Sequence, residues 1–369
     1  MGPGASAAVC FGTMTQTVRR PTFLLYGANG YTGELCAREA RRRGLEIVLA
    51  GRSRAPVERL ARELSLPWRV ASLDDPVALG RTLADVGTVL HCAGPFVRTS
   101  RPMVRACLET GTHYLDITGE MGVFESIHHR GDKARQAGVV LLPGVGFDVV
   151  PTDCLAARLA GRLPGATHLE LAFAGDGAEW SRGTLNTMIE NLPHMGAVRL
   201  AGEIVEVPPA YDTREIDFPG LGRRFVTSVP WGDVSTAFHT TGIPNVRVFT
   251  AMPPAAVKRL RAMAPLLPVA GAKPVKRLLQ AWVRRTVTGP SERVRESGRM
   301  YVWGRVTNGQ GEERTATLST PEGYTFTARA AVEAAWRVAS GEVAPGAWTP
   351  ARAFGEGFVE EIPGVEPGW

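Results

Sequence analysis

The stretch that most constrains the fold of this chain is an apolar segment that runs directly into three glycines. Residues 23–26 have the composition of a buried strand, and Gly27, Gly30 and Gly33 follow at intervals of three residues. Residues 34–43 then favour a helix. A strand, a tight turn and a helix in this order form the phosphate site of dinucleotide-binding folds. We expect the pyrophosphate to be held at the helix N-terminus by Gly27, Asn29, Gly30, Tyr31, Thr32 and Gly33.

The alternation of strands and helices continues beyond this unit. Further apolar runs predict parallel strands at 45–51, 68–71, 88–96, 112–120 and 139–142. Helical patterns separate them at 55–64, from 73, at 101–110 and at 123–137. This order is typical of a Rossmann-type, doubly wound parallel sheet.

From Pro151 the pattern changes to a second, α+β domain. A helix is predicted at 153–162, followed by strands at 168–174, 203–207, 224–228, 246–250, 299–305 and 314–318 in a mostly antiparallel sheet. An alanine-rich helix at 328–340 is expected to return to the first domain. The predicted organisation is therefore a disordered tail at 1–20, a dinucleotide-binding domain at 21–150, a substrate domain at 151–327 and a returning segment at 328–369.

The cofactor type is indicated by the residues that follow the second strand. Dinucleotide folds place a ribose-recognising residue about 20 positions beyond the glycines, and an acidic residue there favours NAD. Here Arg52, Ser53 and Arg54 stand instead, and a guanidinium group matches a 2′-phosphate with two parallel hydrogen bonds. We therefore predict NADP(H). The exit of the fourth strand, at the same sheet edge, is expected to pass close to the ribose and nicotinamide through Ala93, Gly94, Pro95 and Phe96.

Composition limits the remaining classes. The net charge is +6 and the sequence pI is about 9.3, but no aromatic–basic module accompanies the charge, so we do not expect nucleic acid as a partner. The five cysteines are odd in number and never form a Cys-x-x-Cys pair, which favours free thiols in a reducing cytoplasm. No run of 18 apolar residues and no signal peptide is found. No residues have the spacing of a metal site, and the helical pair His128–His129 is expected to be solvated.

Several motifs together carry a family resemblance. They are Gly27 to Gly33, the Ala50–Arg52 strand end, Cys92 to Phe96, Tyr114 to Glu120 and Gly146 to Asp153, with Thr349 to Ala351 and Phe354–Gly355 near the end. In this order they resemble the saccharopine dehydrogenase-like oxidoreductases, and most closely the trans-acting enoyl reductases that serve polyketide synthases. The resemblance covers roughly residues 21–190. It implies that the second sheet covers the nicotinamide half of the cofactor.

The catalytic groups are less sharply indicated. Tyr114 and Asp116 lie in the polar end of the strand at 112–120, with Glu120 close by, and Asp148 follows the strand at 139–142. Tyr114, Asp116 and Asp148 are the candidates, but edge polarity and helix capping explain such residues equally well. Reduction of an enoyl thioester by NADPH is the first hypothesis. The alternatives are an imine or amino-acid dehydrogenase, with Arg182, Arg223 and Arg224 as carboxylate ligands, and a non-catalytic NADP-binding protein at a lipid surface.

A further feature is the absence of Asp and Glu between Val234 and Ser291, where nine basic residues occur. We predict two amphipathic helices between about Pro254 and Arg285, with apolar residues inward and basic residues outward. Three interpretations remain open for this stretch: a solvated face, a docking site for an acidic acyl carrier protein, and a helix on an anionic membrane. The last would make the protein peripheral to a membrane. A homodimer is a further expectation.

Overall fold

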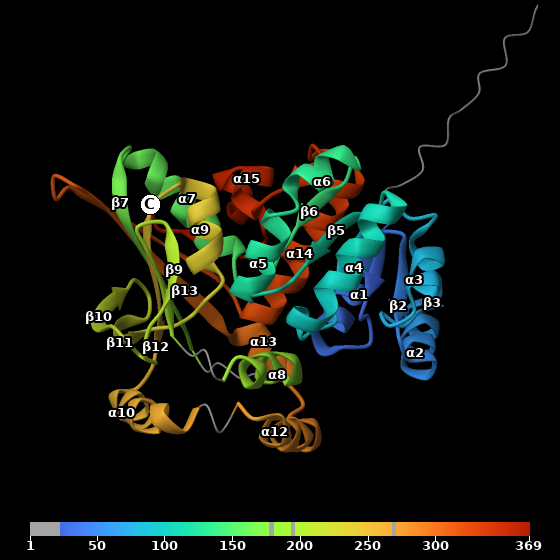
Figure 1. The fold of residues 1–369 in the computed structure, drawn as a ribbon, viewed down its shortest axis with the longest axis horizontal. Coiled ribbons are helices and arrows are strands. Elements are labelled where there is room, and N and C mark those ends of the chain that lie inside the picture. The colour runs from blue at the N-terminus through green and yellow to red at the C-terminus, as the bar shows by residue number, and fades with distance from the viewer. Residues whose placement is uncertain (1–22, 177–180, 193–195, 268–270) are drawn as a thin grey trace, which may run out of the picture.

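The computed structural model describes residues 23–176, 181–192, 196–267 and 271–369 (Figure 1). Its two β-sheets stand side by side, with helices between them and around them. The predicted tail at 1–20 lies outside the described residues. In the part of the chain that is described, no helix is both long enough and apolar enough to cross a membrane.

The first sheet is entirely parallel. Its strands lie in the order β15 (Gly346–Ala347), β6 (Val140–Leu142), β5 (His113–Asp116), β4 (Thr88–His91), β1 (Phe23–Tyr26), β2 (Ile47–Gly51) and β3 (Trp68–Val70). The order reverses at β1, as in a doubly wound fold, because the chain adds strands first on one side of β1 and then on the other. The predicted Rossmann-type fold class is confirmed.

Helices cover both faces of this sheet, since alternate residues of each strand are apolar on opposite sides. Phe23 and Leu25 face a core shared with α1 (Tyr31–Arg42), α2 (Arg54–Leu64) and α14 (Gly323–Ala339). Leu24 and Tyr26 face the other core. The helices of that side are α3 (Pro76–Leu83), α4 (Phe96–Thr110), α5 (Met121–His128) and α6 (Gly131–Gln136).

The second sheet is mixed. Its order is β10 (Thr213–Phe218), β11 (Gly222–Ser228), β12 (Asn245–Ala251), β7 (Ala166–Gly175), β13 (Arg299–Asn308), β14 (Glu313–Pro321) and β16 (Glu366–Pro367). The short strands β8 (Ala197–Leu200) and β9 (Glu203–Glu206) attach to β12. Only β7 and β12 pair in parallel among the described pairs of this sheet, so the prediction of a mostly antiparallel sheet is confirmed.

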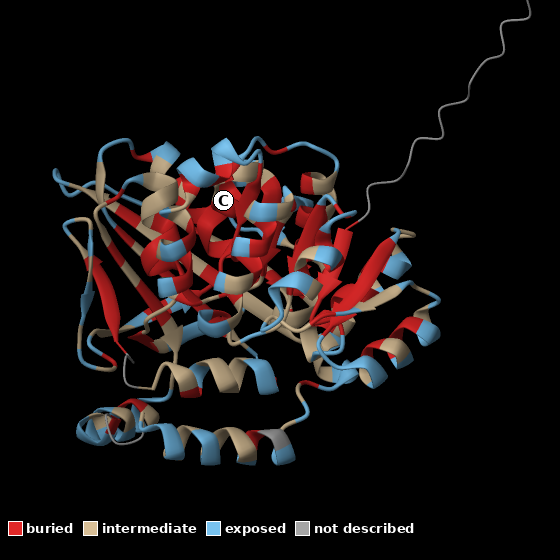
Figure 2. Ribbon diagram, turned by 45° about the vertical axis from the view of Figure 1, so that its right-hand side comes forward, coloured by how far each residue is buried: buried red, intermediate tan, exposed pale blue. Residues whose placement is uncertain are grey.

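The two sheets share one hydrophobic core. It passes from β1 through α14 and α7 (Val150–Arg162) to the inner face of β7 and β13, and Figure 2 shows the buried residues concentrated between the sheets. The elements around this core are α8 (Arg182–Glu190), α9 (Asp233–Thr241), α10 (Pro254–Met263), η1 (Ala264–Leu266), α12 (Lys273–Thr286), α13 (Glu292–Ser297), α15 (Pro350–Phe354) and η2 (Glu356–Glu361).

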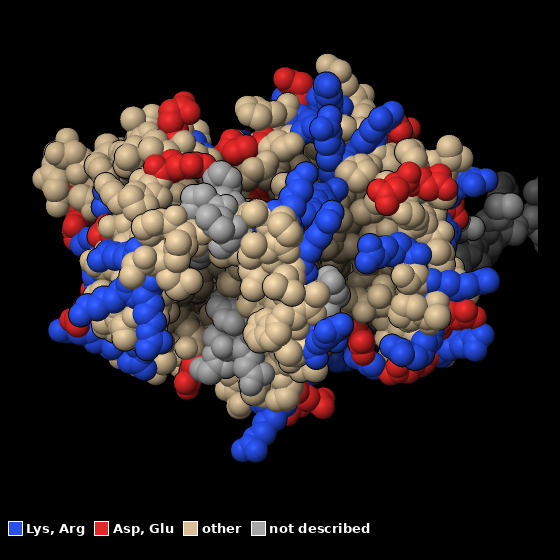
Figure 3. Space-filling model, turned by 60° about the horizontal axis from the view of Figure 1, so that its bottom comes forward, with Lys and Arg blue, Asp and Glu red and all other residues tan. Residues whose placement is uncertain are grey.

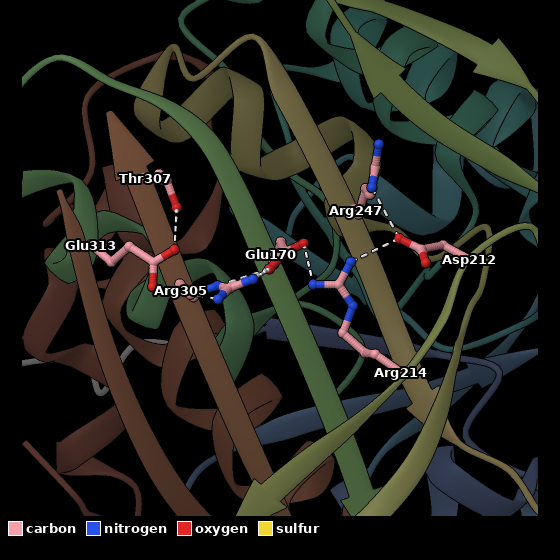
Figure 4. A network of polar contacts seen from close by, with 7 residues as sticks. All are labelled: Glu170, Asp212, Arg214, Arg247, Arg305, Thr307 and Glu313. Carbon is pink, nitrogen blue, oxygen red and sulfur yellow. Dashed lines mark hydrogen bonds and ion pairs between the residues drawn. The ribbon is translucent and has the colours of Figure 1, made fainter. Parts of the chain in front are cut away.

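The far face of the second sheet is tied together by charge (Figure 4). Glu170 on β7 accepts hydrogen bonds from Arg305 of β13 at 2.6 Å and from Arg214 of β10 at 2.5 Å. Arg214 also pairs with Asp212, which in turn binds Arg247 of β12. Arg305 also lies 3.4 Å from Glu313 of β14. The network therefore links five strands, and its three arginines are balanced by three carboxylates.

Several predicted boundaries differ from the structure. The helix predicted at 101–110 begins at Phe96, and that predicted at 328–340 begins at Gly323, because Glu120 and Glu322 cap their N-termini from outside the helical pattern. The helix predicted at 123–137 is broken into α5 and α6 at residues 129–130. The first helix begins at Tyr31, so Thr32 and Gly33 lie inside it.

Candidate active site

The three glycines of the opening motif have distinct geometric roles. Gly27 has φ of +83°, and a Cβ atom on it would lie 2.8 Å from the Ala93 nitrogen. A Cβ atom on Gly33 would lie 2.2 Å from the Gly27 oxygen, which is impossible without moving α1 away from β1. Gly30 meets only the Gly27 oxygen, at 3.2 Å, and is exposed. The turn, the helix packing and the open backbone that a phosphate site needs are therefore all present.

The N-terminus of α1 is left open for an anion. No side chain caps this helix, whose N-cap residue is Gly30. In contrast, Glu120 binds the first N–H groups of α4 and Glu322 those of α14. An uncapped helix N-terminus presents free N–H groups and the positive end of the helix dipole. The residues therefore fit the pyrophosphate of a dinucleotide.

The residues expected to recognise the 2′-phosphate lie between β2 and α2. Arg52, Ser53 and Arg54 are all exposed. The Arg54 guanidinium lies 5.3 Å from the centre of the Trp68 ring and 4.0 Å from a Glu58 oxygen, whereas Arg52 makes no hydrogen bond or ion pair with any residue that the structure describes. Ser53 is the N-cap of α2, yet its hydroxyl does not cap the helix. Arg52 and Ser53 therefore keep their donors free for a phosphate.

Residues 93–96 run past the glycine turn and are fixed by Glu120. Its two carboxylate oxygens accept from Phe96 N at 2.8 Å and from Val97 N at 2.6 Å. Ala93 packs against Gly27, and Gly94 is exposed. Glu120 is thus the cap of α4, and it fixes the loop that the sequence predicts to contact the cofactor.

Tyr114 and Asp116 are brought together but face the interior. Both side chains are fully buried, and the Tyr114 hydroxyl donates to Asp116 at 2.5 Å. Asp116 also accepts from Thr118 N and Gly144 N, each at 3.0 Å. It therefore joins the ends of β5 and β6. Burial raises the pKa of Asp116 to about 6. The geometry gives these two residues a structural role, and their catalytic role stays a prediction.

Asp148 has a different environment. It follows β6, and the N-cap of α7 is Val149, with no side-chain cap, so the alternative of helix capping is wrong for Asp148. Burial, reinforced by the negative charge of Glu120, raises the pKa of Asp148 to about 7. A Cβ atom on Gly119 would lie 2.7 Å from its Oδ2, so the glycine makes room for the carboxyl. Part of Asp148 stays exposed, and it is the one predicted candidate that is both partly exposed and has a pKa near neutral pH.

Tyr324 is a site residue that the sequence did not reveal. Its hydroxyl accepts from Ser181 N at 2.7 Å and lies 2.7 Å from the Thr184 hydroxyl. Its ring packs edge-on against Tyr31 of the glycine turn, with ring centres 5.0 Å apart. Burial raises the pKa of Tyr324, with a contribution from the charge of Asp148. Tyr324 stands 293 positions after the motif that it touches, and no local pattern marks it.

Other candidates lie elsewhere. His128 stacks on His239 with ring centres 3.9 Å apart, and burial lowers its pKa to about 3, so the expectation of a solvated His128 is wrong. His129 is exposed, as expected. Arg182, Arg223 and Arg224 are exposed, and Arg223 lies 3.8 Å from Glu215 on the β10–β11 hairpin. Within the described ranges no group of three His, Cys, Asp or Glu residues could hold a metal ion. The described cysteines, Cys36, Cys92, Cys107 and Cys154, are free.

Comparison with known proteins agrees with this geometry. Residues 23–142 match the family model of the saccharopine dehydrogenase NADP-binding domain. A Mycobacterium tuberculosis protein provisionally named a trans-acting enoyl reductase is 33% identical over 195 residues, which are 48% of this chain and 46% of that protein. A saccharopine dehydrogenase-like oxidoreductase of Bos taurus is 31% identical over 158 residues, which are 37% of each chain.

Similarity of fold extends further than similarity of sequence. The saccharopine dehydrogenase (L-Glu forming) of Saccharomyces cerevisiae matches with a TM-score of 0.63 and 13% identity, over 93% of this chain and 96% of that one. The sequence matches span less than half the length of the curated relatives. Residues 23–142 therefore match a saccharopine dehydrogenase NADP-binding domain, which confirms the predicted cofactor, and the chain is similar to saccharopine dehydrogenase-like oxidoreductases and to trans-acting enoyl reductases.

Proposed function

We propose that the protein reduces the carbon–carbon double bond of an enoyl thioester, with NADPH as the reductant and Asp148 as the proton donor. The observation that carries the proposal is the Asp148 carboxyl, which lies beside Gly119 at the carboxyl edge of the first sheet and whose pKa is raised to about 7, so that it is partly protonated at neutral pH. The choice of an enoyl substrate is supported by the name of the mycobacterial relative. Transfer of that name to this chain rests on the aligned half alone.

The reaction needs a hydride at Cβ and a proton at Cα. Bound NADPH would supply the hydride. The electron pair of the double bond then moves to Cα and the thioester carbonyl, and the Asp148 carboxyl gives its proton to Cα. A general acid works best when its pKa lies near the working pH, and Asp148 meets this condition because burial and Glu120 disfavour its charged form. Water afterwards returns a proton to Asp148.

The acidic groups around this site disfavour a substrate carboxylate. The negative charge of Glu120 helps to raise the pKa of Asp148, and burial raises the pKa of Asp233 well above its usual value. An imine or amino-acid dehydrogenase needs cations for the substrate carboxylates. Arg182, Arg223 and Arg224, the three considered, are exposed, and the last two lie on the β10–β11 hairpin. Arg182, at the start of α8 next to Ser181, is the one of the three that lies beside a residue in contact with Tyr324, and it remains the candidate carboxylate ligand for that alternative.

The test is NADPH oxidation, followed at 340 nm, with two substrate sets. One set contains enoyl thioesters of increasing chain length, and the other contains imines formed from an amino acid and an aldehyde. We expect turnover with the enoyl set, and a loss of at least about 100-fold in kcat for Asp148→Asn, the lower range for removal of a general acid.

The matched control is Asp217→Asn, which makes the same change at an exposed position of β10 and should leave the rate unchanged. Turnover of imines alone would replace the enoyl reductase proposal with the dehydrogenase. Binding of NADPH without turnover of either set would favour a non-catalytic NADP-binding protein.

A further inference from the structure

The helix α12 turns two large apolar side chains away from the protein. Leu278 is 72% exposed and Trp282 is 60% exposed. They are four residues apart, so they lie on one face of the helix, and Arg285 follows one turn later. The opposite face binds the protein, because Val283 is buried and Gln280 donates to Glu190 of α8 at 2.7 Å. The prediction that the apolar residues point inward is therefore wrong for the outer half of this helix.

The neighbouring helix adds to the same pattern. Met263 at the end of α10 is 55% exposed and Leu266 in η1 is 61% exposed. Figures 1 and 2 show α10 and α12 together along one edge of the molecule, beyond α8. We call α10, η1 and α12 the α10–α12 layer. Its two-helix form agrees with the sequence prediction.

Charge distinguishes this layer from an ordinary apolar patch. The sequence contains no Asp or Glu from Val234 to Ser291. On the described surface of the layer, Lys258, Arg259, Lys273, Arg277 and Arg285 are exposed, and Figure 3 shows Lys and Arg side chains in separate groups on this face, with neutral surface between them. Lys276 faces the protein and donates to Glu190 O at 2.5 Å. The side chain of Arg284 lies outside the described atoms.

We propose that the α10–α12 layer docks the protein on an anionic lipid surface, with Leu278 and Trp282 among the acyl chains and Arg277 and Arg285 at the headgroups. A helix with leucine and tryptophan on one side and arginine beside them, lying flat at the interface, is the usual form of such an attachment. The proposal concerns binding alone and does not depend on the reaction.

A lipid surface fits these observations better than an acidic carrier protein does. The basic side chains of the layer would attract an anionic lipid surface and an acidic carrier protein equally well. A carrier, however, needs a matching surface for each exposed apolar side chain, and Leu278 and Trp282 project from a convex helix. Acyl chains adapt to the shape of a projecting side chain, and Trp is enriched at the boundary between lipid headgroups and acyl chains. Binding to lipid therefore accounts for the exposure of the four large apolar side chains of the layer, Met263, Leu266, Leu278 and Trp282. Pairing of charges with a carrier protein does not account for it.

The layer is also connected to the candidate active site. Glu190, which holds Lys276 and Gln280 of α12, binds Arg98 of α4 at 2.6 Å. Thr184, at the other end of α8, contacts the Tyr324 hydroxyl. Only α8 therefore separates α12 from Tyr324. A lipid surface bound to α12 would lie close to the candidate site, and this arrangement suits an apolar substrate that enters from the lipid.

Flotation of the full chain with vesicles tests the proposal. Vesicles of phosphatidylglycerol and phosphatidylcholine should carry the protein, and vesicles of phosphatidylcholine alone should carry much less. The Arg277→Glu and Arg285→Glu double variant should lower binding by at least about tenfold, since each basic residue near an anionic surface contributes about fivefold. The Leu278→Gln and Trp282→Gln double variant should lose binding even at low salt.

Matched controls make the same changes elsewhere on the surface. Arg59→Glu with Arg162→Glu reverses two exposed charges, and Val77→Gln with Val205→Gln removes two exposed apolar side chains; both should bind as the unchanged protein does. Circular dichroism and NADPH binding confirm that each variant is folded. Absence of binding to anionic vesicles, or equal losses in the control variants, overturns the proposal. So does a result in which the α12 variants lose only the reaction with a carrier-bound thioester, which would identify a carrier site.

Discussion

At the scale of single residues, the decisive contrast is between Asp116 and Asp148. Asp116 is the last residue of β5 and Asp148 follows β6, so both acids belong to the carboxyl edge of the first sheet, and the sequence marks them equally. Asp116 is surrounded by three hydrogen-bond donors and joins β5 to β6. Asp148 has no such donors among the described residues, and its carboxyl occupies the space that a side chain at position 119 would fill. The difference lies in neighbours that are distant in sequence, and only the structure could assign the two roles.

This contrast predicts a pH dependence. A proton donor must be protonated, and the pKa of Asp148 is about 7. We therefore expect kcat/KM with an enoyl thioester to be constant at lower pH and to fall tenfold per pH unit above about pH 7. Asp148→Asn should remove this fall together with most of the rate. If kcat/KM of the Asn variant still fell above the same pH, the titrating group would be a residue other than Asp148.

Cofactor preference belongs to the same scale. Arg52→Asp should weaken NADPH binding by about 10- to 100-fold, since a hydrogen bond to a charged group contributes about 1.5–3 kcal/mol. NADH binding should change far less, because NADH lacks the 2′-phosphate. Fluorescence titration with both cofactors measures the ratio. Arg59→Asp makes the same charge change at an exposed site of α2 and should leave the ratio unaltered; an equal shift in both variants would exclude a direct contact by Arg52.

At the scale of elements, the sequence predicts those strands, helices and turns that neighbouring residues determine. Each parallel strand is a continuous apolar run, and the glycine spacing marks the turn, at which the φ angle and the close packing require glycine. The start of α4 was missed because its cap, Glu120, lies 24 residues away. The start of α14 was missed because its apolar pattern begins later than Glu322, which caps it. Strands β8 and β10 were missed because they are short or mostly polar edge segments.

The Glu120 cap gives a prediction at this scale. Glu120→Ala removes the acceptor from two N–H groups of α4, so we expect the free energy of unfolding to fall by about 1–3 kcal/mol. NADPH affinity should fall as well, because the loop from Ala93 to Phe96 loses its anchor. Urea unfolding and cofactor titration measure the two effects. Glu109→Ala, at the exposed C-terminal end of the same helix, is the control, and equal losses in both variants would argue against the cap.

At the scale of the whole molecule, α7, α9 and α15 meet at one buried carboxyl between the sheets. Asp153 on α7 accepts from Ala351 N at 2.8 Å and from the Thr240 hydroxyl. Burial raises its pKa from 3.8 to about 6. The folded protein therefore binds a proton there more tightly than the unfolded chain does, and stability falls as the pH rises from about 4 to about 6.

Asp153→Asn should remove about 2 kcal/mol of this pH dependence between pH 4.5 and pH 7, since a shift of one pKa unit corresponds to 1.36 kcal/mol and the unfolded carboxyl is already mostly ionised at pH 4.5. Glu125, whose pKa is lowered to about 2 by interactions with His239, Ser235 and Arg199 that outweigh its burial, acts below this window. Urea unfolding at pH 4.5 and pH 7 measures the slope, with Asp217→Asn as the control. If the unfolding free energy of Asp153→Asn changed with pH as much as that of the unchanged protein, Asp153 would be ionised in the folded state at no cost in stability.

The reduction of an enoyl thioester is the central claim, and isotope labelling tests it most directly. NADPH deuterated at both C4 positions would be incubated with the protein and an enoyl thioester, and the product analysed by mass spectrometry and NMR. The account predicts a saturated thioester with one deuterium at Cβ, and with deuterium at Cα when the solvent is D₂O and the cofactor is unlabelled. Recovery of unchanged thioester, while the same protein transfers deuterium to an imine carbon, would contradict it.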